Sequence, residues 1–170
     1  VSADDEVFKA IEKEAEDRLV KLLNINGKKS MLDFHKELGA VVWDQIGMSR
    51  TKEGLEDAIN KIRAIKEDFW TNLKLTGEKN TFNKYLEFAG RVADFIELAE
   101  LMAIDALHRN ESCGGHFREE YQTPEGEALR NDDEFAYVAG WEFTGEKTKP
   151  NLHKEKLVFE NIKLSQRSYK

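Results

Sequence analysis

The feature that most constrains the fold is a helical periodicity of apolar residues across the first two thirds of the chain. Four stretches show it, at about residues 3–23, 30–47, 51–75 and 81–109. Apolar residues at steps of three and four fall on one face of an α-helix, so each stretch predicts an amphipathic helix. In the first stretch that face is expected to consist of Phe8, Ile11, Ala15, Leu19 and Leu22.

Residues that cap helices stand at three of the four predicted starts. Ser30, Thr51 and Thr81 each precede a periodic stretch, and their hydroxyls can accept a hydrogen bond from the first helical turn. Asn26-Gly27 and Thr76-Gly77 fall between stretches and predict turns. Helices joined by short turns run antiparallel, so the sequence predicts an up-and-down bundle of three long helices plus a flanking one.

The fourth stretch is the longest and carries a second apolar face beside its main one. The residues of this second face are Phe88, Phe95, Leu98 and Met102. Because a central bundle helix must bury two sides, we expect this face to lie in the core, the alternative being a docking face for a partner. Trp43 and Trp70 lie on or beside helical apolar faces and are expected in the core as well.

The helical periodicity stops after Arg109. Residues 135–143 and 156–164 are rich in aromatic and aliphatic side chains and predict two short strands, paired antiparallel across residues 145–151. The sequence therefore predicts a mainly α fold with a small irregular C-terminal tail. We expect a helical bundle domain at residues 1–110 and, at 111–170, a loop and β-containing tail packed on the bundle.

Composition narrows the class of protein. With 40% hydrophobic and 35% charged residues the chain falls among globular proteins, and its net charge of −7 argues against nucleic acid as a partner. The single cysteine, Cys113, excludes an internal disulfide. No apolar run reaches the roughly 20 residues needed to span a bilayer, so direct membrane insertion is not expected.

Residues 108–120 form the chemically densest segment of the chain. Its residues are consistent with three uses. The segment could bind zinc through His108, Cys113 and His116, together with Glu119 or Glu120. It could hold a nucleophile and its base, Cys113 and His116. Or it could be a packing loop, whose cations bind the carbonyl groups at the helix end and whose acids pair with arginines. The packing loop is the expected use, and no metal is expected. Gly114-Gly115 permits a sharp turn within it.

The same segment resembles a family signature. It is similar to the run Arg-x-Glu-Ser-Arg-Gly-x-His-x-Arg-x-Asp that follows the long helix in flavoprotein subunits of succinate dehydrogenase and fumarate reductase. Residues that match in register are Arg109, Glu111, Ser112, Gly114, His116 and Arg118. Cys113 and Glu120 depart from it, standing where the commoner pattern has Arg and Asp. Three further stretches resemble the family: residues 35–39, 43–50 and 90–94, with the closing run 160–170.

The resemblance implies that the chain is the C-terminal part of a larger flavoenzyme subunit. In the parent, a preceding domain would hold FAD, and hydride would pass between the flavin and succinate or fumarate, within electron transport and the tricarboxylic acid cycle. An iron-sulfur subunit and a membrane anchor would be its partners, at the cytoplasmic face of the inner membrane. No Gly-x-Gly-x-x-Gly occurs in the 170 residues, so no cofactor-binding residue is expected among them.

The role implied for this stretch is structural. The catalytic groups of the family precede it, so no catalytic residue is expected and the chain alone is expected to catalyse nothing. The six matching residues, Arg109 to Arg118, are expected to form an interdomain motif that packs on the flavin domain together with part of the second apolar face of the long helix. The alternative is a free-standing helical interaction module whose charged loop binds a partner or a metal.

Overall fold

A computed structural model of the chain describes residues 2–145 and 148–165. The chain divides into two compact units, residues 1–108 and residues 109–170. That residues 111–170 pack on the bundle stays a prediction. Of the closing run that resembles the family, residues 166–170 lie outside the described part.

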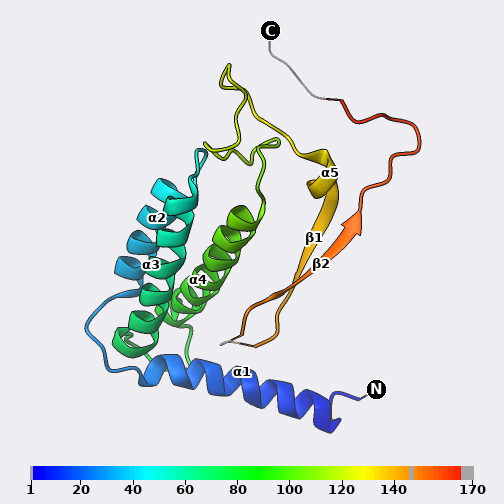
Figure 1. Ribbon diagram of the computed structural model, residues 1–170. Helices are drawn as coiled ribbons and strands as arrows, with labels where there is room; N and C mark the ends of the chain where they lie inside the picture. Colours follow the sequence, from blue (N-terminus) through cyan, green and yellow to red (C-terminus); the bar gives the residue numbers. More distant parts are fainter. Residues whose placement is uncertain (1, 146–147, 166–170) are drawn as a thin grey trace. The chain divides into compact units, whose positions relative to one another are not determined.

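The first unit consists of four helices: α1 (Glu6–Asn24), α2 (Met31–Gln45), α3 (Lys52–Asn72) and α4 (Lys84–His108). Helices α2, α3 and α4 pack against one another, whereas α1 contacts α4 and lies across one end of the bundle (Figure 1). The predicted arrangement of three long helices plus a flanking one is therefore confirmed. Among the described residues, no helix has both the length and the apolar character needed to cross a membrane.

Two of the three predicted caps are confirmed. The Ser30 hydroxyl accepts from the Asp33 backbone N–H, and the Asp33 carboxylate accepts in return from the Ser30 side chain and backbone, which lowers the pKa of that carboxyl. Thr51 accepts from the Gly54 N–H at 3.0 Å. The prediction for Thr81 is wrong: α4 begins at Lys84, because the Asn83 side-chain oxygen accepts from the N–H groups of residues 85 and 86.

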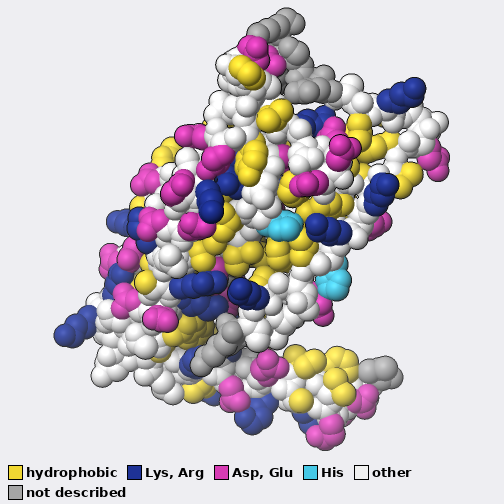
Figure 2. Space-filling view, in the orientation of Figure 1, with side chains coloured by type: hydrophobic (Ala, Val, Ile, Leu, Met, Phe, Trp, Pro, Cys, Tyr) yellow, Lys and Arg dark blue, Asp and Glu magenta, His cyan; other side chains and the backbone are white. Residues whose placement is uncertain are grey.

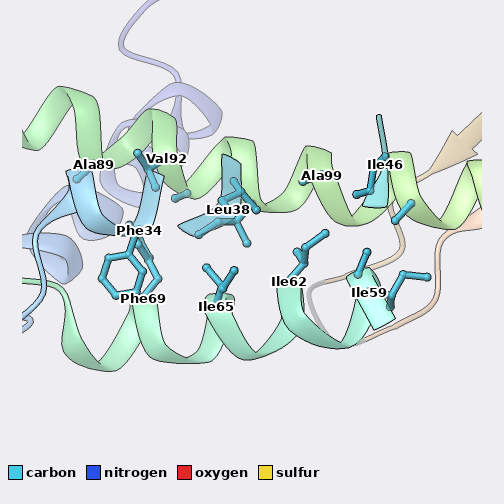
Figure 3. Packing of buried hydrophobic residues seen from close by; sticks show 14 of the residues in the cluster. Phe34, Leu38, Ile46, Ile59, Ile62, Ile65, Phe69, Ala89, Val92 and Ala99 are labelled. Atoms are coloured by element: carbon cyan, nitrogen blue, oxygen red, sulfur yellow. The ribbon is translucent and has the colours of Figure 1, made fainter. Parts of the chain in front are cut away.

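The core of the first unit lies between α2, α3 and α4. Phe34 of α2 and Phe69 of α3 meet edge to face with ring centroids 5.2 Å apart, and Leu38, Ile62 and Ile65 continue the packed layer along the bundle (Figure 3). The α4 side of this layer includes small side chains, Ala89 and Ala99 among those drawn, which let the helix backbones approach closely. The faces that the periodicity predicts for α2 and α3 lie in this core or pack against it, and that of α4 does so from Ala89 to Ala106. Phe82 and Tyr85, expected at the start of the same α4 face, are exposed.

The segment between α1 and α2 is tied to the end of α3. The N–H groups of Gly27 and Lys28 donate to the carbonyl oxygens of Leu73 and Asn72 at 3.0 and 2.9 Å. A Cβ atom on Gly27 would lie 1.9 Å from backbone atoms of Asn72, so only glycine fits there. The ammonium of Lys29 then pairs with Glu37 of α2 and, at 3.1 Å, with Asp68 of α3. This linker therefore fixes where α1 joins the bundle.

Several large apolar side chains remain exposed where the core was expected. Trp43 is 80% exposed, and on the second face of α4 Leu98 is 55% exposed, with Phe95 and Met102 at 40% and 43%. The expectation for Trp43 is wrong, and that for the second face of α4 holds only for Phe88, which packs against the core. The helices that contact α4 leave the rest of this face uncovered. Trp70, by contrast, is half-buried against Phe69, as expected.

The second unit contains a short helix, α5 (Asp132–Phe135), and the strands β1 (Tyr137–Glu142) and β2 (Asn151–Lys156). The strands pair antiparallel, with Tyr137 opposite Lys156 and Glu142 opposite Asn151. The first predicted strand is confirmed with shorter bounds. The second predicted strand, at 156–164, is wrong, because strand pairing begins earlier in the chain, at Asn151. The connecting loop is then shorter and closes at a lower cost in entropy. Residues 157–165 are exposed and form no helix or strand.

Candidate functional site

The segment that matches the family signature begins the second unit and folds back on itself. Cys113 and His116 exchange both backbone hydrogen bonds, N–H to O at 2.8 and 3.0 Å, so two glycines form the tip of a tight hairpin. Gly114 has a φ of +59° in the first of these two positions, the pattern of a type II′ turn. Of the paired glycines that the sequence singled out, Gly114 is therefore needed for backbone conformation, and both are exposed.

Ser112 closes the base of this hairpin. It is fully buried, and its hydroxyl both accepts from the Arg118 N–H at 2.9 Å and donates to the Arg118 carbonyl oxygen at 3.1 Å. Its own N–H donates to the Leu129 carbonyl oxygen at 2.8 Å. One side chain thus joins the two arms of the hairpin, and its backbone joins the loop to a segment seventeen residues further along.

Glu111 is a buried carboxylate at the centre of a second set of contacts. Its exposed fraction is 2%; one oxygen accepts from Nε of Arg109 at 2.7 Å and the other accepts from the backbone N–H of Asn131 at 2.8 Å. The Arg109 guanidinium also donates to the Phe135 carbonyl oxygen at 3.1 Å and lies over that ring. The pair therefore fastens the start of the unit to both ends of α5, whose N-cap is Asn131.

Arg118 is as deeply buried as the serine, at 1% exposed. Its Nε donates to the Glu120 carboxylate at 3.1 Å, and its guanidinium lies 5.5 Å from the ring centre of Tyr121. A buried charge persists only when it is paired and hydrogen-bonded. Arg118 therefore acts as an internal support of the loop, and it is not available on the surface to grip a substrate.

The two histidine-cysteine hypotheses find no geometric support. The Nε2 atom of His116 lies 2.9 Å from the Arg109 carbonyl oxygen, which can only accept, so this nitrogen carries the proton and donates. Of the residues that the structure describes, no three His, Cys, Asp or Glu side chains come together in a way that could hold a metal ion. His108 belongs to the last turn of α4. The geometry favours the packing loop.

All six residues of the predicted motif lie in this one loop, from Arg109 to Arg118. The glycine tip is exposed, whereas Glu111, Ser112 and Arg118 are buried, and that the motif packs on another domain stays a prediction. Sequence reasoning missed Asn131, which caps α5 and supplies the N–H that binds Glu111. An asparagine before three acidic residues is a recognisable helix start, so a signal was present.

Comparison with known families gives a single assignment. Residues 35–169 match the model of the family described as fumarate reductase flavoprotein C-term. The chain belongs to this family. The match covers well over half of the chain and includes the loop of residues 109–118, so the resemblance drawn from the sequence is confirmed.

Individual relatives agree with the family. The fumarate reductase flavoprotein subunit of Proteus vulgaris is 30% identical over 106 residues, covering 62% of this chain and 18% of that protein. The succinate dehydrogenase flavoprotein subunit of Bacillus subtilis is 28% identical over 129 residues, covering 76% of this chain and 21% of that protein. The flavoprotein C-terminal domain described above therefore spans about a fifth of the length of these relatives.

A solved structure shows the same fold. The Escherichia coli quinol fumarate reductase chain superposes with a TM-score of 0.82 at 23% sequence identity, covering 98% of this chain and 27% of that chain. At this identity the likeness concerns the fold. Because it covers nearly all of this chain, the likeness extends to both compact units.

Proposed function

We propose that this flavoprotein C-terminal domain is a structural support of its parent enzyme and contributes no catalytic group. The observation that carries the proposal is the burial of the signature residues. Glu111, Ser112 and Arg118 are at most 2% exposed, and their polar atoms are engaged by neighbours within the same unit. A side chain held in this way stabilises a loop and cannot reach a substrate outside it.

The exposed parts of the domain supply the surface for the preceding flavin domain. The hairpin tip at Gly114-Gly115 is one such part, and the face of α4 formed by Phe95, Leu98 and Met102 is another. Monomeric proteins rarely leave contiguous apolar faces in water, and such faces mark interaction sites. In this proposal the buried network keeps the hairpin tip in one conformation, so that the flavin domain meets a rigid surface.

For the parent we propose the chemistry that the family resemblance implies. FAD held by the preceding domain supplies hydride transfer between succinate and fumarate, with electrons passing to or from quinone through an iron-sulfur subunit and a membrane anchor. The parent would lie at the cytoplasmic face of the inner membrane. The domain described here binds neither FAD nor dicarboxylate in this proposal; it braces the parts that do.

The parent enzyme offers the test, through the isosteric change Glu111→Gln. Because the carboxylate supports the loop and touches no substrate, kcat per bound flavin and KM for succinate should stay within about twofold of the wild type, while thermal stability falls. The exposed Glu125→Gln serves as the matched control and should change neither. A tenfold rise in KM at unchanged stability would assign Glu111 to the substrate site and contradict the proposal.

A further inference from the structure

Helix α1 exposes an apolar face along most of its length. Phe8 is 46% exposed and Ile11 57% exposed, and Val7 and Leu19 are exposed beside them. Figure 2 shows hydrophobic side chains gathered at the N-terminal end of this helix. Phe8, Ile11 and Leu19 follow the three- and four-residue steps of one helical face, so the exposure is a continuous stripe rather than scattered single residues.

The stripe continues an interface that exists within the first unit. Its last member, Leu22, is 1% exposed and belongs to the bundle core. The same end of α1 is fixed by ion pairs, Arg18 with Asp94 of α4 at 2.6 Å and Glu16 with Lys79 at 2.5 Å. The helix is thus anchored at its C-terminal end, and its apolar face runs on beyond the bundle without a partner among the described residues.

The size of the stripe argues against a second copy of the chain as its partner. Helix α1 has 19 residues, which gives a length of about 28 Å and, for a helix about 10 Å wide, a face of roughly 280 Å². A stable interface between separate molecules buries about 800 Å² per partner. A face this small suffices when the partner is covalently attached, because the tether raises its effective concentration into the millimolar range.

The charge of the helix argues against a lipid surface. Helices that lie on membranes carry an excess of lysine and arginine on their polar face, which attracts anionic lipid. Helix α1 has five acidic and four basic residues, a net charge of −1, and Asp4 and Asp5 precede it directly. An apolar protein surface is therefore the better fit.

We infer that the stripe of Phe8, Ile11 and Leu19 is the docking surface for the segment of the parent chain that precedes this domain. About four fifths of the length of the curated relatives lies outside this chain, and the matching family is a C-terminal one, so the absent segment joins the domain directly ahead of α1. The inference rests on the proposed function and names the helix face that the proposal leaves open.

Hydrogen exchange of α1, measured in the 170-residue chain and in the full-length parent, tests the inference. In the parent, amides of residues 7–19 should be protected at least about tenfold more than in the isolated chain. The double change Phe8→Gln and Ile11→Gln should leave the Tm of the isolated chain unchanged and lower that of the parent by about 4 °C or more. Ala10→Gln, on the polar face of the same helix, is the control and should leave both unchanged.

Equal exchange of α1 in the two proteins, with the double variant no different from the control in the parent, overturns the inference. Concentration-dependent dimerisation of the isolated chain, abolished by the double change, would assign the stripe to a second copy and also overturns it. Flavin content and succinate oxidation by the parent are measured separately. A parent that binds flavin and is active while α1 stays unprotected contradicts this inference alone, whereas a parent without flavin contradicts the proposed function.

Discussion

Replacing Glu111 by alanine should destabilise the second unit more than any change on its surface. The substitution removes a carboxylate that is 2% exposed and leaves two donors without their acceptor, Nε of Arg109 and the backbone N–H of Asn131. Breaking a buried pair by removing one partner costs about 3–5 kcal/mol. Because the arginine side chain is 27% exposed and can regain some water, the lower end applies, about 3 kcal/mol.

The assay is urea unfolding, detected by hydrogen exchange in peptides from residues 109–145, so that the second unit is observed by itself. With an m value of about 1–3 kcal/mol/M in urea, a loss of 3 kcal/mol lowers the unfolding midpoint by about 1–3 M. Glu125→Ala removes the same side chain from an exposed position of the same unit and should stay within about 0.5 kcal/mol of the wild type. A Glu111→Ala variant as stable as that control would refute the reasoning.

Two further predictions concern the first unit. Gly27→Ala should lower the free energy of unfolding by about 3 kcal/mol, because the new Cβ would lie 1.9 Å from the Asn72 backbone. Gly39→Ala, whose Cβ would meet no atom within 4 Å, should stabilise α2 by about 0.5–1 kcal/mol. Urea titrations that show equal stability for the two variants would contradict this. The hydrogen bond from Lys29 lowers the pKa of Asp68, so the stability that this pair contributes is present above the ordinary aspartate pKa and is lost as the pH falls below about 4. Lys29→Met should therefore flatten the loss of stability between pH 5 and pH 3, and an unchanged acid profile would exclude this pair as its source.

Local signals predicted the bundle well because helix formation there depends on near neighbours. The Ser30 cap and the buried faces that include Phe34 and Phe69 follow from residues within one or two turns of each other. Trp43 lies beside the apolar face of its helix, and periodicity alone could not tell whether a third helix would cover it. Its exposure depends on where α4 and α1 are placed, which is a tertiary property.

The sequence pattern identified the residues of the candidate site, but it did not predict which of them are buried. The pattern from Arg109 to Arg118 identified the family, yet whether Glu111 faces a partner or the interior depends on Asn131, twenty residues away. The second strand failed for a related reason: the apolar run at 156–164 looked like a strand, but the register of the hairpin is set by loop closure. Both cases are decided by pairing between segments, which the composition of one segment does not reveal.

The central claim is that this chain is the C-terminal support domain of a larger flavoprotein. Intact mass of the native gene product, recorded together with its visible absorption spectrum, tests it most directly. The account predicts a polypeptide several times heavier than 19.6 kDa that carries a flavin spectrum. A native product of 19.6 kDa without flavin would contradict it.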